Sequence, residues 1–156
     1  MSQSLKLEIQ ILDDQAKVEI CGPVDEDSNF EKIQAIKQDI FVLNLNKVSL
    51  MNSCGVREWI NLVESLPKSS TIIYENVPQL VVEQMNMVKG FLTPNSQIKS
   101  FYAPYYNEDN DKITAVLLTS EQIKDGKAPE MKDEDGKELE FDAIEAQYFN
   151  FLKQQA

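Results

Sequence analysis

The chain has 156 residues, of which 42% are hydrophobic and 26% are charged, a composition typical of a soluble globular domain. Its formal net charge of −11 repels phosphate backbones and anionic lipid surfaces, which argues against nucleic acid and membranes as partners. The sequence contains no histidine, which excludes a Ser–His or Cys–His hydrolase of the usual form.

The cysteine content and the first residues indicate a reduced, cytoplasmic protein. Two cysteines, Cys21 and Cys54, are too few for a disulfide framework. The opening MSQSLKLEIQ lacks the long apolar core of a signal peptide, and no apolar run approaches the roughly 20 residues that span a bilayer. We therefore expect a cytoplasmic location.

The first forty residues predict a hairpin, a helix and the start of a buried strand. Apolar and polar residues alternate over 5–11 and again over 17–20, which predicts two antiparallel strands joined by a turn at 13–15. Ser28 and Glu31 stand at capping-box spacing, so a helix should begin at about Asn29. The apolar run 40–43 is typical of a central strand covered on both faces.

The next sixty residues continue the alternation of helix and strand. Four apolar residues recur at helical spacing before Pro67 ends the helix: Val56, Trp59, Ile60 and Val63. A strand is predicted over 71–74, a helix with Pro78 at its first position and Gly90 as its C-cap, and a last strand over 98–102. The first hundred residues therefore predict an α/β fold, a mixed sheet with helices packed on it.

The composition changes near residue 106. From Asn107 to Glu145 there are 13 Asp and Glu against 5 Lys, a net charge of −8. We therefore expect two units, 1–103 and 104–156. The second should be a small β-rich appendage with a strand over 113–118, turns over 121–140 and a terminal helix. Asp142 and Glu145 stand at capping spacing, and the aromatic side chains that follow should pack on a surface.

The segment 41–62, FVLNLNKVSLMNSCGVREWINL, together with Gly22, resembles the STAS family, the sulfate-transporter and anti-sigma-antagonist domain. The family pattern is a hydrophobic strand, an Asp, a short link and an Asp-Ser-Ser/Thr-Gly turn that opens a helix. The resemblance covers about residues 5–102.

The resemblance implies a regulatory role for Ser53. In the signalling branch of the family, the serine at this position is phosphorylated by a partner kinase that is also the anti-sigma factor. The present sequence has Asn44 and Asn52 where the family has Asp, and Cys54 where it has a second hydroxyl residue.

The tail from FYAPYYNEDND to APEMKDEDGKELEFD resembles a zinc ribbon that has lost its cysteines. Asn107 and Asn110 occupy the places of the first cysteine pair, and Lys132 and Asp135 those of the second. These residues do not make a tetrahedral zinc site, so we expect no metal. The acidic residues Asp109, Asp111, Asp133 and Asp135 could suggest Ca²⁺, but they lack the spacing of an EF-hand loop, and a solvated acidic surface is favoured.

Ser53 and its neighbours permit more than one interpretation. A serine at a helix start caps backbone N–H groups, and the same position suits a phosphoserine. Gly55 would let another backbone come close. Cys54 could be a reactive thiolate near the helix start or a small buried hydrophobe. Trp59 could anchor a partner or pack in the core, and its place on the apolar face favours the core.

The resemblance to the STAS family implies a non-enzymatic regulatory module that binds a protein partner, an anti-sigma factor or kinase, and uses no cofactor. The expected partner-binding residues lie at the turn and the start of the helix: Asn52, Ser53, Cys54, Gly55, Arg57 and Glu58. A degenerate scaffold without phosphorylation, a small-ligand sensor and an enzyme of unfamiliar type are the alternatives, the last being disfavoured.

Overall fold

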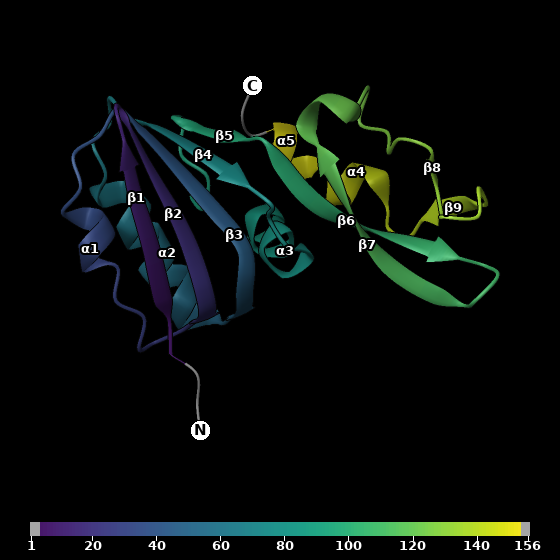
Figure 1. Ribbon diagram of the computed structural model, residues 1–156, viewed down its shortest axis with the longest axis horizontal. Coiled ribbons are helices and arrows are strands. Elements are labelled where there is room, and N and C mark those ends of the chain that lie inside the picture. The colour runs from purple at the N-terminus through teal and green to yellow at the C-terminus, as the bar shows by residue number, and fades with distance from the viewer. Residues whose placement is uncertain (1–3, 154–156) are drawn as a thin grey trace.

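The computed structural model describes residues 4–153 as an α/β chain with two β-sheets (Figure 1). The first sheet has the strand order β1 (Lys6–Leu12), β2 (Gln15–Val24), β3 (Ile40–Met51), β4 (Thr71–Glu75) and β5 (Ser96–Ile98). β1 and β2 are antiparallel and the other neighbours are parallel, so the predicted mixed sheet is confirmed. Asp13 closes the hairpin in the left-handed region, at φ 53°, which Asp adopts more readily than most residues.

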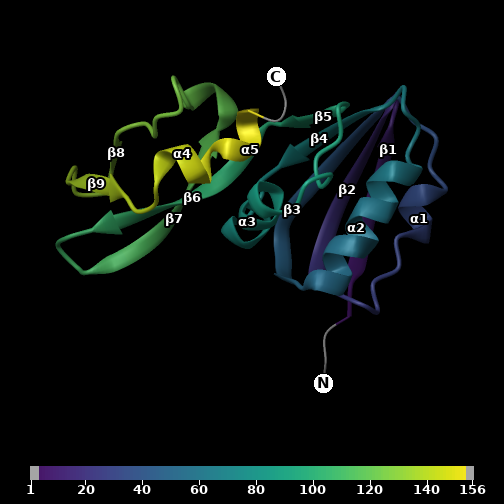
Figure 2. The same ribbon diagram turned by 180° about the vertical axis from the view of Figure 1, so that it is seen from behind.

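Only one face of this sheet is covered by helices, so the prediction of a strand covered on both faces is wrong. Helices α1 (Glu31–Gln34) and α2 (Ser53–Ser65) lie together on one side (Figure 2). Phe41, Leu43 and Leu45 of β3 are buried on that side. Val42 faces the open side, where Lys17 and Ile73 of the neighbouring strands flank it. Because these side chains flank Val42, β3 can carry an apolar run although one of its faces is not covered by helices.

Helix α1 is a single turn, and the predicted capping box is wrong. Its N-cap is Phe30, with no side-chain cap. The Ser28 hydroxyl instead accepts a hydrogen bond from the Asp25 N–H at 2.8 Å and so closes the preceding turn. A serine in a turn can serve its own backbone as well as a helix end, and here the turn prevails.

The buried side of α2 forms the centre of the core. Trp59 is fully buried, and its Nε1–H donates to the Tyr74 hydroxyl at 3.1 Å. Its ring also contacts Phe30, edge to face at 5.5 Å, and Phe91, stacked at 6.3 Å. Burial raises the pKa of Tyr74, so this hydroxyl stays protonated. The core interpretation of Trp59 is confirmed and the partner-anchor alternative is wrong.

Helix α3 (Gln79–Met87) follows β4 and joins the two sheets. Pro78 was predicted to be the first helical residue, but it is the N-cap, and the helix begins one residue later. Its C-cap is Val88 rather than Gly90, which lies two residues further on with φ 93°. Val81, Val82 and Met85 on its inner side are buried.

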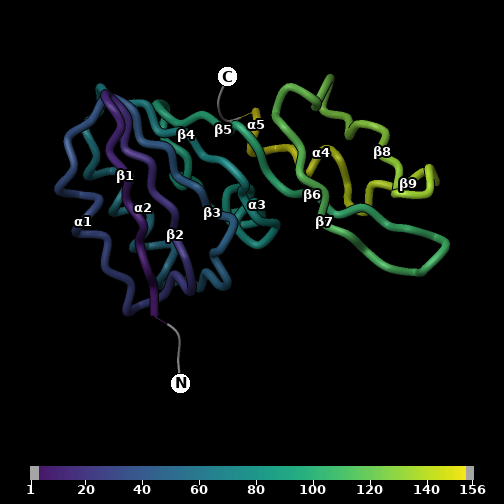
Figure 3. The backbone as a smooth tube through the Cα atoms, viewed as in Figure 1, coloured from purple at the N-terminus to yellow at the C-terminus, as the bar shows by residue number. Residues whose placement is uncertain are grey.

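The second sheet has the strand order β7 (Lys112–Thr119), β6 (Ser100–Asn107), β9 (Glu138–Phe141) and β8 (Met131–Lys132). The last strand predicted for the first sheet, 98–102, is therefore wrong, because β5 ends at Ile98 and β6 begins the second sheet at Ser100. Figure 3 shows the backbone running from β5 directly into β6. β6 also passes through residue 103, where the boundary between two units was expected. The segment 121–140 contains β8 and the start of β9 rather than turns alone.

The expected terminal helix is present as two consecutive short helices, α4 (Glu145–Tyr148) and α5 (Asn150–Lys153). Asp142 does not cap α4, since the N-cap is Ile144. The aromatic side chains pack on the second sheet as expected, with Phe149 and Phe151 at 6.0 and 5.1 Å from the Phe101 ring. Within residues 4–153, no helix is long and apolar enough to cross a membrane.

Asn86 fastens these helices to α3. Its Nδ2 donates to the Tyr148 carbonyl at 2.9 Å, and its Oδ1 accepts from the Phe151 N–H at 2.7 Å. We expect Asn86→Ala to lower the free energy of unfolding by about 1–3 kcal/mol, because two partly buried backbone groups lose their partner. Hydrogen exchange should show α4 and α5 opening first. Asn61→Ala, at an exposed position of α2, is the control. Unchanged exchange in α4 and α5 of Asn86→Ala would contradict the role.

Candidate functional site

The candidate site is the corner where β3 ends at Met51 and α2 begins at Ser53. Asn52 is the N-cap, and its Oδ1 accepts from the Gly55 N–H at 2.8 Å. The interpretation of Ser53 as the cap is therefore wrong. Ser53 is the first helical residue and is exposed, and within the described part of the chain its hydroxyl makes no hydrogen bond.

Gly55 allows the end of β2 to touch this corner. A Cβ at Gly55 would lie 1.9 Å from the Val24 carbonyl oxygen, so only glycine fits without a shift of the backbone. The same carbonyl accepts from the Asn52 N–H at 3.3 Å. The predicted close approach of another backbone is confirmed, and it positions Ser53 relative to β2.

A carboxylate lies beside the corner although the sequence has none at residue 52. The Asn52 Nδ2 donates to Glu26 Oε2 at 3.0 Å. The pKa of Glu26 lies below its usual value, because its own backbone N–H and then the Asn52 amide stabilise the ionised form. The acidic loop 25–27 can be seen in the sequence. The contact between Glu26 and Asn52, 26 positions apart, arises only because β2 and β3 pair in parallel and end side by side.

The remaining candidates and one further residue complete the surface. Arg57, the only arginine of the chain, is exposed one helical turn after Ser53, on the same side of α2. Glu58 is partly exposed. Cys54 is exposed, so its interpretation as a buried hydrophobe is wrong. Leu50, which sequence analysis missed, is 46% exposed at the end of β3 and adds an apolar group beside the corner.

Asn52→Ala removes the side chain that caps α2, and we expect it to lower the free energy of unfolding by about 0.5–2 kcal/mol. Asn52→Asp, the matched control, keeps a capping oxygen and should lose less. It also removes the amide that donates to Glu26 and adds a second carboxylate, so the pKa of Glu26 should rise in an NMR titration. Equal stabilities of wild type and Asn52→Ala in urea unfolding would contradict this account of the corner.

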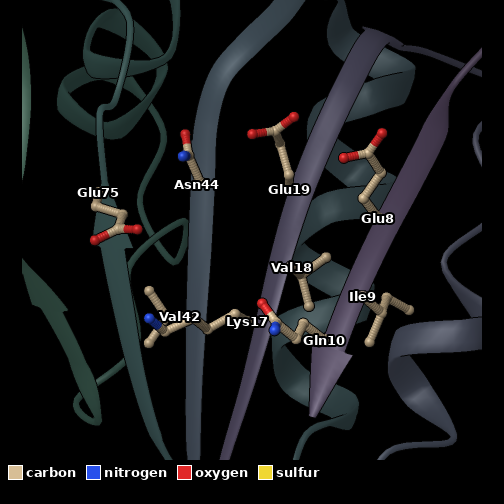
Figure 4. Close-up of a pocket in the computed structure, with 9 residues that line it drawn as sticks. All are labelled: Glu8, Ile9, Gln10, Lys17, Val18, Glu19, Val42, Asn44 and Glu75. Carbon is tan, nitrogen blue, oxygen red and sulfur yellow. The ribbon is translucent and has the colours of Figure 1, made fainter. Parts of the chain in front are cut away.

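A separate polar hollow of about 290 Å³ lies on the open face of the first sheet (Figure 4). Glu8, Glu19, Asn44 and Glu75 stand opposite one another across four strands. Lys47 pairs with Glu19 at 3.0 Å, which is the main reason why the pKa of Glu19 is lowered. None of the candidate residues of the corner lines this hollow, so we do not assign the corner's function to it.

The turns of the two C-terminal hairpins meet where the ribbon resemblance places a metal. Asn107 Nδ2 donates to Asp133 Oδ2 at 3.0 Å, and Lys137 Nζ pairs with Asp109 Oδ1 at 2.8 Å. Asn107, Asn110, Lys132 and Asp135 supply two amides, an ammonium and one carboxylate, a set that does not fit tetrahedral zinc. In residues 4–153, no group of three or more Cys, Asp or Glu is placed to hold a metal ion.

The corner thus combines an exposed hydroxyl, a cap supplied by its neighbour and a backbone contact that requires glycine. The only arginine lies one turn further along the helix. No protein-family model and no curated protein matches this chain.

Proposed function

We propose that this chain is a non-enzymatic regulatory module, similar to the anti-sigma factor antagonists of the STAS family, that acts in a bacterial cytoplasm. Its partner, an anti-sigma factor or kinase, docks on Asn52, Ser53, Cys54, Gly55, Arg57 and Glu58, and phosphorylation of Ser53 weakens the docking. The observation that carries the proposal is the free, exposed Ser53 hydroxyl, whose capping role is taken by Asn52.

Phosphorylation at this position is physically reasonable on two grounds. The start of a helix of 13 residues favours negative charge through its backbone N–H groups and its dipole. Arg57, one turn along, can pair with a phosphate at Ser53. The phosphate adds about −1.5 to −2 charges next to the weakly polar surface of Leu50 and Cys54. A partner packed on that surface would have to desolvate the phosphate, which costs binding free energy.

Phosphosite mapping tests the modification itself. The protein is incubated with an extract of its native cells and ATP, and mass spectrometry locates the phosphate. We expect modification of Ser53 and its loss in Ser53→Ala. Phosphate found only outside residues 52–55 would refute the switch.

The effect on docking is tested with a pair of variants that differ in charge alone. Ser53→Asp should bind the captured partner at least about tenfold more weakly than Ser53→Asn, a difference of about 1.4 kcal/mol. Melting curves of both variants check the fold. Equal affinities would show that negative charge at this position does not govern docking.

A scaffold that binds its partner without phosphorylation is the second candidate. Glu26 favours it, because its carboxylate, held by Asn52, opposes a further negative charge at the corner. In that case Ser53→Ala would bind the partner and respond to signals as the wild type does.

A further inference from the structure

Strand β7 leaves an unprotected edge on the second sheet. Proteins shield sheet edges by keeping them short or by placing charges on them. Among the described strands, the edges β5 and β8 have three and two residues, and β1 carries Lys6 and Glu8. β7 has eight residues, and from Ile113 to Thr119 it contains no charge and no proline. It is therefore the edge best suited to pair with another strand.

The hydrogen bonds of β6 show which groups β7 offers. The Pro104 carbonyl accepts from the Asp142 N–H at 2.9 Å, on the side of β6 away from β7. Pro104 stands opposite Ala115. In an antiparallel pair, the backbone N–H and C=O groups of two directly opposite residues point either toward each other or both away from each other. The N–H and C=O of Ala115 therefore face the free edge, and those of Ile113 and Leu117 do so by the same alternation.

The side chains of these three residues lie on the face that helices leave open. α4 and α5 cover the other face of the second sheet (Figure 2). Ile113 is 62% exposed and Leu117 is 45% exposed, so β7 presents two large apolar groups to solvent. The half-buried rings of Tyr102 and Tyr106 stand directly opposite them in β6.

We infer that β7 pairs antiparallel with β7 of a second copy of this chain, about a twofold axis at Ala115. This register sets Ile113 of each copy opposite Leu117 of the other, with the small Ala115 side chains facing each other between them. All three pairs are of the hydrogen-bonded type and exchange two backbone bonds each. Each Ile–Leu pair adds about 0.2–1 kcal/mol relative to alanine. The two four-stranded sheets become one sheet of eight strands.

An antiparallel pair also separates the lysines that open the two strands. With Ala115 on the axis, Lys112 of each copy lies opposite Leu118 of the other, whereas an in-register parallel arrangement would place Lys112 beside Lys112. The uncharged segment also lies within the region of net charge −8, so it is where two acidic copies approach with least repulsion.

The experiment measures the mass of the full chain by light scattering and sedimentation over a wide concentration range. The wild type should approach twice the 17.8 kDa of one chain. Ala115→Pro removes an N–H that faces the edge and not β6, so the fold persists while the dimer is lost. Leu117→Lys should also give the monomer, and it keeps the test valid if the proline variant unfolds. Met87→Lys, at a 71% exposed site outside this sheet, should remain a dimer.

Amide exchange supplies an independent measurement on the wild type. The N–H groups of Ile113, Ala115 and Leu117 should become protected as the concentration rises. A wild type that stays monomeric at every concentration overturns the inference. The same holds if the monomer pairs β7 with a strand of a different protein. A dimer that survives both β7 variants overturns it as well.

Discussion

Replacing Trp59 with alanine will lower the free energy of unfolding by about 3–5 kcal/mol, the largest loss we expect from a single change. The side chain is fully buried and contacts Phe30, Tyr74 and Phe91. Its removal leaves a cavity between α2 and the sheet and deprives the Tyr74 hydroxyl of its donor. Trp59 is the only tryptophan, so urea unfolding must be followed by circular dichroism.

Two variants separate the parts of this effect. Tyr74→Phe removes only the hydroxyl and leaves the Trp59 N–H without an acceptor, which should cost about 1–3 kcal/mol. Trp59→Phe keeps most of the ring packing and should fall between Tyr74→Phe and Trp59→Ala. A loss below about 1 kcal/mol in Trp59→Ala would show that this cluster is not the centre of the core.

Gly55→Ala will also destabilise the protein, although alanine normally stabilises a helix by about 1 kcal/mol relative to glycine. The new Cβ would lie 1.9 Å from the Val24 carbonyl oxygen, which is backbone and cannot rotate away. We expect a net loss of about 1–3 kcal/mol as β2 and α2 move apart. The free energy of unfolding, measured in urea, should therefore fall if the clash with Val24 dominates and rise if the helix preference of alanine dominates.

The control for Gly55→Ala is Asn61→Ala, at an exposed position of the same helix, which should be neutral or slightly stabilising. If Gly55→Ala proved as stable as Asn61→Ala, the close contact between β2 and the corner would be disproved. In NMR spectra, Gly55→Ala should shift the amide signals of Val24 and Asn52 most, because these residues share the contact.

Periodic segments of the sequence predict the fold well. Alternation in β1 and β2 and helical spacing in α2 identify these elements because each has one wet side and one dry side. β3 runs on to Met51, but its part from Asn44 onward is too polar to be recognised as a strand. The hydroxyl of Ser28 could serve a helix or a turn, and only the tertiary structure decides. β8 and β9 are too short for any period to appear.

The corner could be predicted because a buried strand followed by small polar residues and a helical pattern fixes a turn. Its chemistry could not. The exchange of roles between Asn52 and Ser53 depends on a one-residue difference in where α2 begins. Glu26 reaches the site from the loop that follows β2. Leu50 is exposed near the end of β3, which still pairs with β2 there but extends past β4. Contacts between distant segments leave no trace in local patterns.

The two contacts between the turns of the C-terminal hairpins determine which solution conditions would destabilise this region. An amide–carboxylate hydrogen bond and a lysine–aspartate pair hold them, where ribbons of the usual kind rely on thiolates and zinc. Chelators, zinc starvation and oxidants, which unravel such ribbons, have no bond to attack at these two contacts. Concentrated salt and acid, which screen or neutralise carboxylates, are the conditions that would loosen them.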